Sequence, residues 1–163
     1  DQILYNVPGR TAVNMSVETT ARLSEISNII GIKDATGDLT IIRELVKSCP
    51  ENFLLLTGDD ATAVDFLLLG GHGGISVTAN VTPKELQKVY MTAIAGNAEL
   101  ARQANKELTN LHQNLFLESN PIPVKWALHK MGLCSKGIRL PLLELSSEFR
   151  PVIENDLKEL NLL

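Results

Sequence analysis

Lys33 is the residue whose type and position most directly suggest chemistry. It follows the apolar run Ile29–Ile32, so its amine stands at the end of a strand that is expected to be buried. Loss of solvation disfavours the charged form of a lysine and leaves a neutral amine that can attack a ketone. The position therefore suggests a Schiff-base lysine. A strand-terminal lysine that reaches solvent, or that pairs with Asp34, is the structural alternative.

Two further side chains follow the first apolar run, Ile3–Val7, and could act with such a lysine. Tyr5 could present a phenol as proton donor and acceptor, although a tyrosine packed at a sheet edge is the commoner case. Arg10 lies in the loop expected after the strand, where its planar guanidinium could hold a substrate carboxylate. A solvated loop arginine is the alternative.

The remaining polar clusters favour structural interpretations. Asp59 and Asp60 follow the third apolar run and are explained by capping of a helix over 61–69, so no metal site is predicted. His72 lies within a glycine cluster that is expected to turn before the fourth strand, far from the chemistry. His112 and His129 lack ligand partners at metal spacing, and we expect surface or interface roles for them.

The elements that would position these residues are four short strands. Each apolar run is continuous rather than alternating, which is typical of strands buried on both faces, and we expect them at 3–7, 29–33, 53–57 and 74–78. Helix-compatible segments separate the runs. In the clearest of them, apolar residues recur on one helical face, as Leu39, Ile42, Leu45, Val46 and Cys49. Repeated βα units require a parallel sheet with right-handed crossovers.

The rest of the chain reads as helix. Thr82-Pro83-Lys84-Glu85 resembles a capping box, and the helix that it opens should pause at Gly96-Asn97. Further helices are predicted from about Ala98 to Phe116, from Pro123 to near Gly132, and after Ser146-Ser147. We expect two parts, with four βα units over 1–96 and a helical C-terminal extension over 97–163.

Such units could form an open doubly wound sheet or half of an eightfold barrel. No glycine-rich nucleotide-binding motif follows any strand. A whole (β/α)8 TIM barrel needs about 250 residues, whereas the chain has 163. The expected fold is therefore α/β, half of a TIM barrel followed by helices.

Composition limits the function classes. The chain is 44% hydrophobic and 21% charged, with a formal net charge of −4, and its basic residues form no run. Nucleic acid and anionic membrane surfaces are therefore not expected partners. Two distant cysteines, Cys49 and Cys134, suggest reduced thiols, and no stretch approaches the roughly 20 apolar residues of a membrane span. We expect a cytoplasmic protein.

Several segments together resemble the dihydrodipicolinate synthase family of pyruvate-dependent class I aldolases. The resemblance covers essentially the whole chain in order and spacing. It is carried by Tyr5-Asn6-Val7-Pro8-Gly9-Arg10-Thr11, Gly31-Ile32-Lys33-Asp34-Ala35-Thr36-Gly37-Asp38, Gly58-Asp59-Asp60, Gly70-Gly71-His72-Gly73-Gly74-Ile75-Ser76-Val77 and Asn120-Pro121-Ile122-Pro123-Val124-Lys125.

The resemblance implies a lyase of lysine and diaminopimelate biosynthesis that condenses pyruvate with L-aspartate 4-semialdehyde and needs no cofactor. By position, Lys33 would form the imine with pyruvate and Tyr5 would pass protons. Arg10 would bind the carboxylate of the semialdehyde, the backbone carbonyl of Ile75 would border the pyruvate pocket, and Gly58 would belong to the substrate-binding residues. N-acetylneuraminate lyase and sugar-acid aldolases share the lysine and tyrosine, but Arg10 favours the synthase.

The resemblance also implies that this chain is the second half of a TIM barrel, strands 5 to 8, followed by C-terminal helices. The family's N-terminal half, with its Gly-Thr-Thr loop and second tyrosine, would then lie outside this chain. We therefore expect little turnover from the chain alone, and either a homo-oligomer or a companion N-terminal half. A non-catalytic half-barrel that only self-associates is the alternative from a different class, because four unpartnered parallel strands expose two edges and an apolar face.

Overall fold

The computed structural model describes all 163 residues, which form two compact units. Unit 1 comprises residues 1–76 and 88–102, and unit 2 comprises residues 77–87 and 103–163. Each unit has a hydrophobic core of its own.

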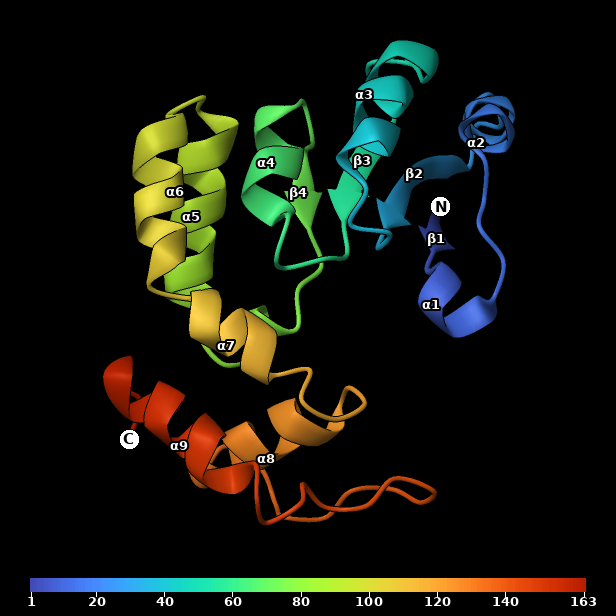
Figure 1. Ribbon diagram of the computed structural model, residues 1–163. Helices are drawn as coiled ribbons and strands as arrows, with labels where there is room; N and C mark the ends of the chain where they lie inside the picture. The colour runs from blue at the N-terminus through green and yellow to red at the C-terminus, as the bar shows by residue number, and fades with distance from the viewer. The chain divides into compact units, whose positions relative to one another are not determined.

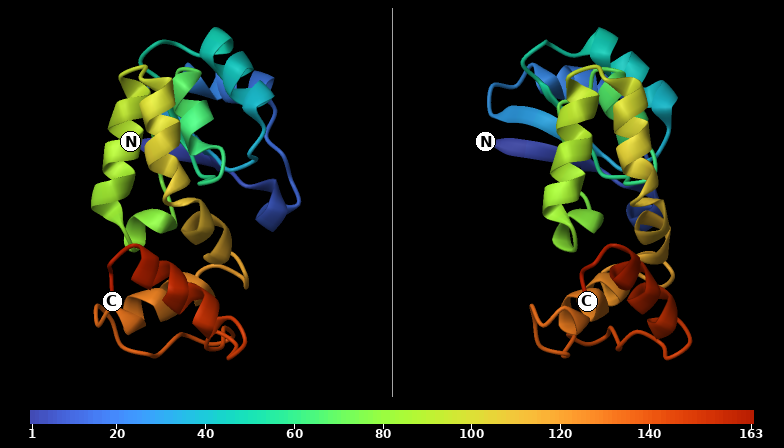
Figure 2. Two further views of the ribbon diagram at one scale, coloured as in Figure 1. Left: turned by 60° about the vertical axis from the view of Figure 1, so that its left-hand side comes forward. Right: turned by 90° about the vertical axis from the view of Figure 1, so that its left-hand side faces the viewer.

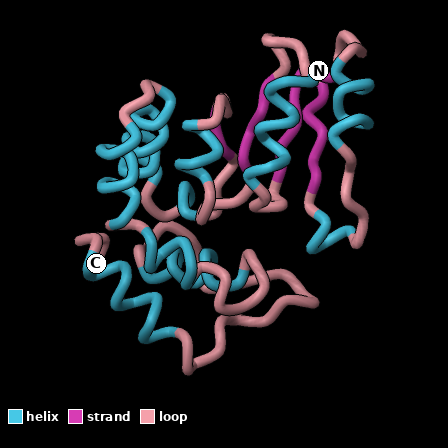
Figure 3. Tube along the Cα trace, turned by 45° about the horizontal axis from the view of Figure 1, so that its top comes forward, coloured by secondary structure: helices cyan, strands magenta, loops and turns pink.

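Unit 1 is built on a parallel four-stranded sheet in the order β1-β2-β3-β4 (Figure 1). The strands are β1 (Gln2–Asn6), β2 (Ile29–Asp34), β3 (Leu54–Thr57) and β4 (Gly73–Gly74). Figure 3 shows them side by side, with the helices packed beside them. The first three strands confirm the apolar runs as parallel strands, and β1 and β4 are the edges of the sheet. The prediction that the strands are buried on both faces was wrong for β1, in which three of the five residues are exposed.

The fourth strand is shorter than the sequence predicts. Only Gly73 and Gly74 pair with β3, and the amide of Ile75 extends the ladder by one bond to the carbonyl of Thr57, at 2.9 Å. Val77 is already helical, and the 3₁₀ turn η1 (Thr78–Asn80) follows. The prediction of a strand over 74–78 was therefore wrong, because a short apolar run does not distinguish a strand from the start of a helical segment.

Helices alternate with the strands of unit 1. They are α1 (Pro8–Thr11), α2 (Val17–Ser24), α3 (Leu39–Ser48) and α4 (Ala63–Leu68). Ser16 accepts a hydrogen bond from the amide of Thr19 at the start of α2, and Asp38 accepts one from Thr40 at the start of α3. Helix α3 contacts both α2 and α4 (Figure 2). Helix α2 also contacts β2, and α3 and α4 contact β3.

The core of unit 1 lies between these helices and one face of the sheet. Ile32 of β2 and Leu55 of β3 point to the helices, because alternate strand residues point to opposite faces. They meet Ile42 and Leu45 of α3, as the helical periodicity predicts, whereas Val46 of the same predicted face is 44% exposed. The opposite face of the sheet is open, and Ile3 is 43% exposed there.

Three helices follow β4 and η1: α5 (Pro83–Ile94), α6 (Ala98–Lys106) and α7 (Thr109–Asn114). The hydroxyl of Thr82 donates to the carboxylate of Glu85 at the start of α5, and Gly96 has φ +80° where the chain turns into α6. One helix from Ala98 to Phe116 was predicted, but the chain breaks before Thr109. Leu108 at the break and Leu111 after it are both buried, so the turn directs two leucines into the core.

Unit 2 is helical and contains α8 (Ile122–Lys130) and α9 (Arg150–Glu159), which confirms the two last predicted helices. Helix α9 contacts both α7 and α8. Its Ile153 and Leu157 are fully buried together with Leu115 and Leu145.

His112 does not have the surface or interface position that the sequence suggested. It is only 4% exposed, and its two ring nitrogens lie 2.8 Å from the Thr78 hydroxyl and 3.1 Å from Oδ1 of Asn105. The ring therefore joins η1 to helices α6 and α7 within unit 2. His129 is half-buried, and its Nδ1 lies 3.3 Å from the carbonyl of Cys134.

Both cysteines are free thiols and half-buried, which confirms the prediction of unpaired cysteines. None of the helices has the length and apolar character that crossing a bilayer would require.

Candidate functional site

The structure brings Lys33 and Tyr5 into direct contact. The two residues are partners in the register of β1 and β2, one residue before each strand ends. Nζ of Lys33 lies 4.1 Å from the centroid of the Tyr5 ring, which is cation–π contact. Lys33 is half-buried and Tyr5 is 49% exposed, so both stand on the open face of the sheet at its carboxyl end. That end is where parallel α/β barrels carry their chemistry.

Gly58 makes the room that Lys33 occupies. It directly follows β3, and its amide donates to the carbonyl of Asp34 at 2.6 Å. A Cβ at position 58 would lie 2.6 Å from Cε of Lys33 and 2.9 Å from Cβ of Ala35. The glycine is therefore needed for the close approach of the lysine side chain, and not for a left-handed backbone.

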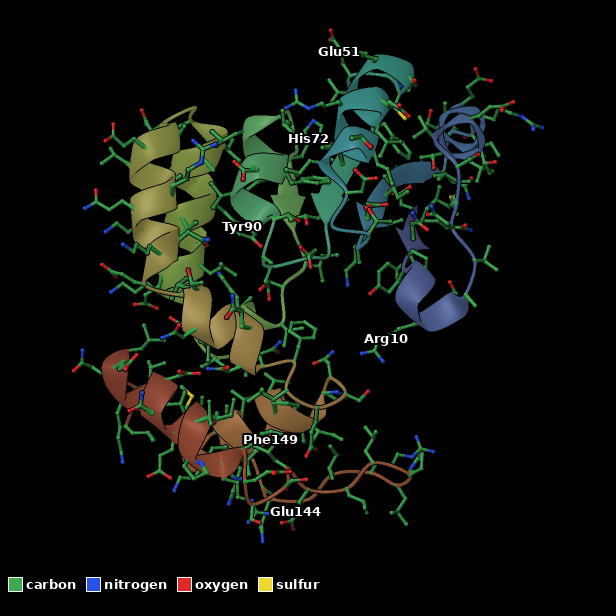
Figure 4. All side chains as sticks on the ribbon, in the orientation of Figure 1. Arg10, Glu51, His72, Tyr90, Glu144 and Phe149 are labelled. Atoms are coloured by element: carbon green, nitrogen blue, oxygen red, sulfur yellow. The ribbon has the colours of Figure 1, made fainter.

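Arg10 lies on the short helix α1 rather than in an open loop. Pro8 begins this helix and the amide of Arg10 donates to the carbonyl of Val7 at 2.9 Å. The Arg10 side chain is exposed and extends away from the helix (Figure 4). Helix α1 starts at the carboxyl end of β1, so Arg10 belongs to the same end of the sheet as Tyr5.

Ile75 stands next to the end of β4. Its amide is held by the carbonyl of Thr57, and its side chain is 49% exposed. The backbone of Ile75 is thereby fixed beside Thr57, which is the last residue of β3 and directly precedes Gly58. The five predicted site residues thus come from four consecutive strand ends.

Asp59 serves the turn that leads to α4. Its Oδ2 accepts from the amide and the hydroxyl of Thr62, at 3.0 and 2.7 Å. The sequence predicted that Asp59 or Asp60 caps a helix over 61–69, but α4 begins at Ala63 with Thr62 at the cap position and without a side-chain cap bond. Asp59 therefore stabilises the turn before the helix. Asp60 is 3% exposed.

Sequence reasoning missed a buried polar pair behind Lys33 and Tyr5. Asn6 and Asp34 are 2% and 4% exposed, and Nδ2 of Asn6 donates to Oδ2 of Asp34 at 2.8 Å. The signal was available, because each polar residue follows a candidate catalytic residue at the end of a buried strand. Such a residue points to the helix-covered face and must be hydrogen-bonded there.

Tyr90 was also missed, because it lies inside a helix with no motif around it. It reaches from α5 toward β4 (Figure 4). A Cβ at Gly74 would lie 2.6 Å from the Tyr90 ring and 2.8 Å from its hydroxyl. Burial raises the pKa of the Tyr90 phenol, and the nearby carboxylates of Asp60 and Asp59 raise it further against a hydrogen bond with Ser76.

Comparison with known proteins gives one consistent family. A model of the dihydrodipicolinate synthetase family matches residues 1–160. The chain belongs to the dihydrodipicolinate synthase family. The 4-hydroxy-tetrahydrodipicolinate synthase of Ruthia magnifica subsp. Calyptogena magnifica is 58% identical over 163 residues, which is the whole of this chain and 55% of the relative. That of Alcanivorax borkumensis is 53% identical over 162 residues, again 55% of its length.

Solved structures of dihydrodipicolinate synthases agree with these relatives. The chloride-inhibited enzyme of Acinetobacter baumannii, complexed with pyruvate, superposes with a TM-score of 0.96 at 50% identity, over 99% of this chain and 55% of that chain. The enzyme of Thermotoga maritima superposes with a TM-score of 0.95 at 39% identity, over 99% and 56%. The chain thus spans about half the length of the family members that it matches.

The family match confirms the predicted fold class. This chain is the second half of a TIM barrel, strands 5 to 8, followed by the C-terminal helices. The sheet in Figure 3 is open because it contains four parallel strands. The site residues line the carboxyl ends of those strands.

Proposed function

We propose that this chain supplies the Schiff-base half of a 4-hydroxy-tetrahydrodipicolinate synthase, with Lys33 as the residue that forms the imine. The main structural support for this proposal is the contact of the Lys33 amine with the Tyr5 ring at the carboxyl end of the sheet. Relatives named 4-hydroxy-tetrahydrodipicolinate synthase at 53–58% identity support the proposal, as does the Acinetobacter baumannii structure complexed with pyruvate.

In the proposed reaction, Nζ of Lys33 attacks the ketone carbon of pyruvate and water leaves, which forms the imine. Loss of a proton from the methyl group converts the imine to an enamine. The enamine carbon attacks the aldehyde carbon of L-aspartate 4-semialdehyde. The amine of the semialdehyde then displaces Lys33 from the imine carbon, which closes the ring and frees the lysine.

The other site residues have separate proposed roles. Tyr5 passes protons during imine formation and ring closure, since its phenol can both donate and accept. Arg10 binds the carboxylate of the semialdehyde through its planar guanidinium. Gly58 admits the lysine side chain, and the carbonyl of Ile75 borders the pyruvate.

We further propose that turnover needs groups outside this chain. The matched relatives are nearly twice as long, and the sheet face that carries Lys33 is open here. Solvent water competes with every polar contact at such an open face. The part of the site that this chain carries should therefore bind pyruvate weakly by itself. The missing βα units would come from the same or another polypeptide, and would complete the pocket.

Borohydride trapping tests the role of Lys33. The chain is incubated with pyruvate and sodium borohydride, alone and after mixing with the N-terminal half of the Ruthia magnifica relative, and then analysed by intact mass and peptide mapping. We expect one reduced pyruvate adduct on Lys33, in higher yield with the added half. Lys33→Gln should abolish it, whereas Lys47→Gln on the exposed side of α3 should not.

Two results would contradict the proposal. An adduct distributed over several lysines, and unchanged in Lys33→Gln, would show ordinary surface chemistry. No adduct on Lys33 in the mixture, with association of the halves verified by light scattering, would favour a non-catalytic half-barrel. If the adduct forms, comparing L-aspartate 4-semialdehyde with sugar aldehydes as the second substrate separates the synthase from related pyruvate aldolases.

A further inference from the structure

Asn6 and Asp34 form a buried pair directly behind the candidate catalytic pair. The register of β1 and β2 places Tyr5 opposite Lys33 and Asn6 opposite Asp34. Because alternate strand residues point to opposite faces, Tyr5 and Lys33 share the open face and Asn6 and Asp34 share the covered face. The ion pair between Lys33 and Asp34 that the sequence left open is therefore not formed, since Asp34 is bonded to Asn6 and Thr36 instead.

The side-chain amide of Asn6 uses both of its donor hydrogens and its oxygen in hydrogen bonds. Nδ2 donates to Oδ2 of Asp34 at 2.8 Å and to Oδ1 of Asn14 at 2.9 Å, while Oδ1 accepts from the amide of Met15 at 3.0 Å. These contacts tie the end of β1 to the segment that leads from α1 into α2.

The carboxylate of Asp34 is held by neutral donors alone. Its Oδ1 accepts from the amide of Thr36 at 3.0 Å and from the Thr36 hydroxyl, and its Oδ2 accepts from Asn6. The backbone continues the connection, because Ala35 donates to the carbonyl of Asn6 and Gly58 donates to that of Asp34. The pair therefore links the ends of β1, β2 and β3 at one level.

A slip of one residue between β1 and β2 would reverse these faces. It would move Lys33 or Tyr5 to the core and separate the Asp34 carboxylate from the amide of Asn6. Asp34 would keep its bonds from Thr36, but a buried carboxylate that loses one of its donors is disfavoured. The hydrogen bonds of the pair thus oppose the displacements that would separate the Lys33 amine from the Tyr5 ring.

We propose that Asn6 and Asp34 are positioning residues that hold the Tyr5 phenol against the Lys33 amine. The geometric part of this inference stands on the structure alone. Its consequence for imine formation rests on the proposed function.

The test compares substitutions that weaken the pair with a matched control. Thr36→Val removes one hydroxyl donor to Asp34 at nearly constant shape, and Asn6→Leu removes the link to β1. Thr40→Val removes the same kind of bond, from the Thr40 hydroxyl to Asp38 at 2.7 Å, at the exposed start of α3. The combined swap Asn6→Asp with Asp34→Asn reverses the polarity of the pair but keeps a donor facing an acceptor.

Three readouts are measured on each variant. The first is the ¹³C and ¹H shift of the Lys33 ε-methylene group, which the Tyr5 ring current moves upfield. The second is the rate of borohydride trapping with pyruvate in the presence of the complementary half. The third is the unfolding midpoint.

We expect Thr36→Val and Asn6→Leu to return the Lys33 signal toward that of an exposed lysine and to slow trapping by about tenfold or more, because small misplacements of reacting groups are costly. Thr40→Val should change neither, and the swap should restore both. A lowered unfolding midpoint with unchanged Lys33 shift and trapping rate would overturn the proposal and leave the pair a structural role only.

The experiments distinguish a failure of the Schiff-base proposal from a failure of the positioning proposal. If the unsubstituted chain forms no adduct on Lys33, the Schiff-base proposal fails, and the Lys33 shift alone decides whether the pair positions the two side chains. If Asn6→Leu does not fold, Thr36→Val and the swap decide the outcome.

Discussion

At the scale of single residues, space controls the site as much as charge does. The side chain of Lys33 follows a path over the backbone of Gly58 and ends on the ring of Tyr5. Any atom added at position 58 occupies that path. A larger apolar residue at position 58 should therefore slow the reaction of Lys33 with pyruvate, although it changes no charged or polar group.

Gly58→Ala provides this test. The added methyl group would lie 2.6 Å from Cε of Lys33, too close for a real contact, so the lysine must move. Because a misplacement of about 1 Å can cost about 100-fold in rate, we expect borohydride trapping of pyruvate on Lys33 to slow by about 10- to 100-fold. Gly9→Ala on α1 is the control, since no atom lies within 4 Å of a Cβ built there. Equal trapping rates for the two variants would show that Lys33 reaches pyruvate by another path.

At the scale of elements, the strand ends are held by the helices behind them. Helix α5 packs Tyr90 against Gly74 of β4, which carries the backbone of Ile75 toward the site. Helices α2 and α3 begin at side-chain caps and cover the other strands. Stability of these elements can be measured without any substrate.

Tyr90 predicts a loss of stability at high pH. Burial raises the pKa of its phenol above the ordinary value of 10.0, so the folded chain keeps the proton where the unfolded chain loses it. The contribution is fully present below pH 10 and is lost as the pH rises through the folded-state value. We expect the free energy of unfolding, from urea denaturation, to fall above pH 10 less steeply in Tyr90→Phe than in the unsubstituted chain. An equally steep fall in Tyr90→Phe would show that the buried phenol of Tyr90 is not its source.

The N-cap of α2 gives a second prediction at this scale. Oγ of Ser16 accepts from the amide of Thr19 at 3.1 Å, and its removal leaves an unpaired donor in the first turn. Ser16→Ala should therefore lower the free energy of unfolding by about 1 kcal/mol, measured by urea denaturation. Ser27→Ala, in the turn between α2 and β2, serves as the control. If it lowers the free energy of unfolding as much as Ser16→Ala does, the cap makes no specific contribution to stability.

At the scale of the whole molecule, the sheet has a covered face and an open one. Ile3 and Tyr5 are 43% and 49% exposed on the open face, beside the half-buried Leu54 and Leu56. Strands β1 and β4 are both unpaired on one side. An open apolar face with two free edges favours association with another chain or with a complementary half.

We therefore predict that the chain by itself associates in solution. Light scattering should give a mass of at least two chains, and Ile3→Lys on the open face should lower it by introducing like charges into the contact. Val13→Lys adds the same charge at a residue that is 68% exposed before α2, and it should leave the mass unchanged. A single species of one-chain mass at all concentrations would count against association through this face.

The sequence by itself determined the parts that depend on short stretches of chain. Continuous apolar runs indicated the strands, the periodicity of Leu39, Ile42 and Leu45 indicated α3, and position marked Lys33 at a strand end. The family resemblance, which the comparisons confirm, came from the same short segments. These features are local because strand and helix periods are visible within ten or so residues.

Only the tertiary structure decided which side chains meet. Lys33 contacts Tyr5, and Asp34 pairs with Asn6, because the register between β1 and β2 joins residues 28 positions apart in the chain. The burial of His112 against Thr78 depends in the same way on packing between distant segments. Register and burial are set by long-range packing and hydrogen bonding, which no local pattern contains.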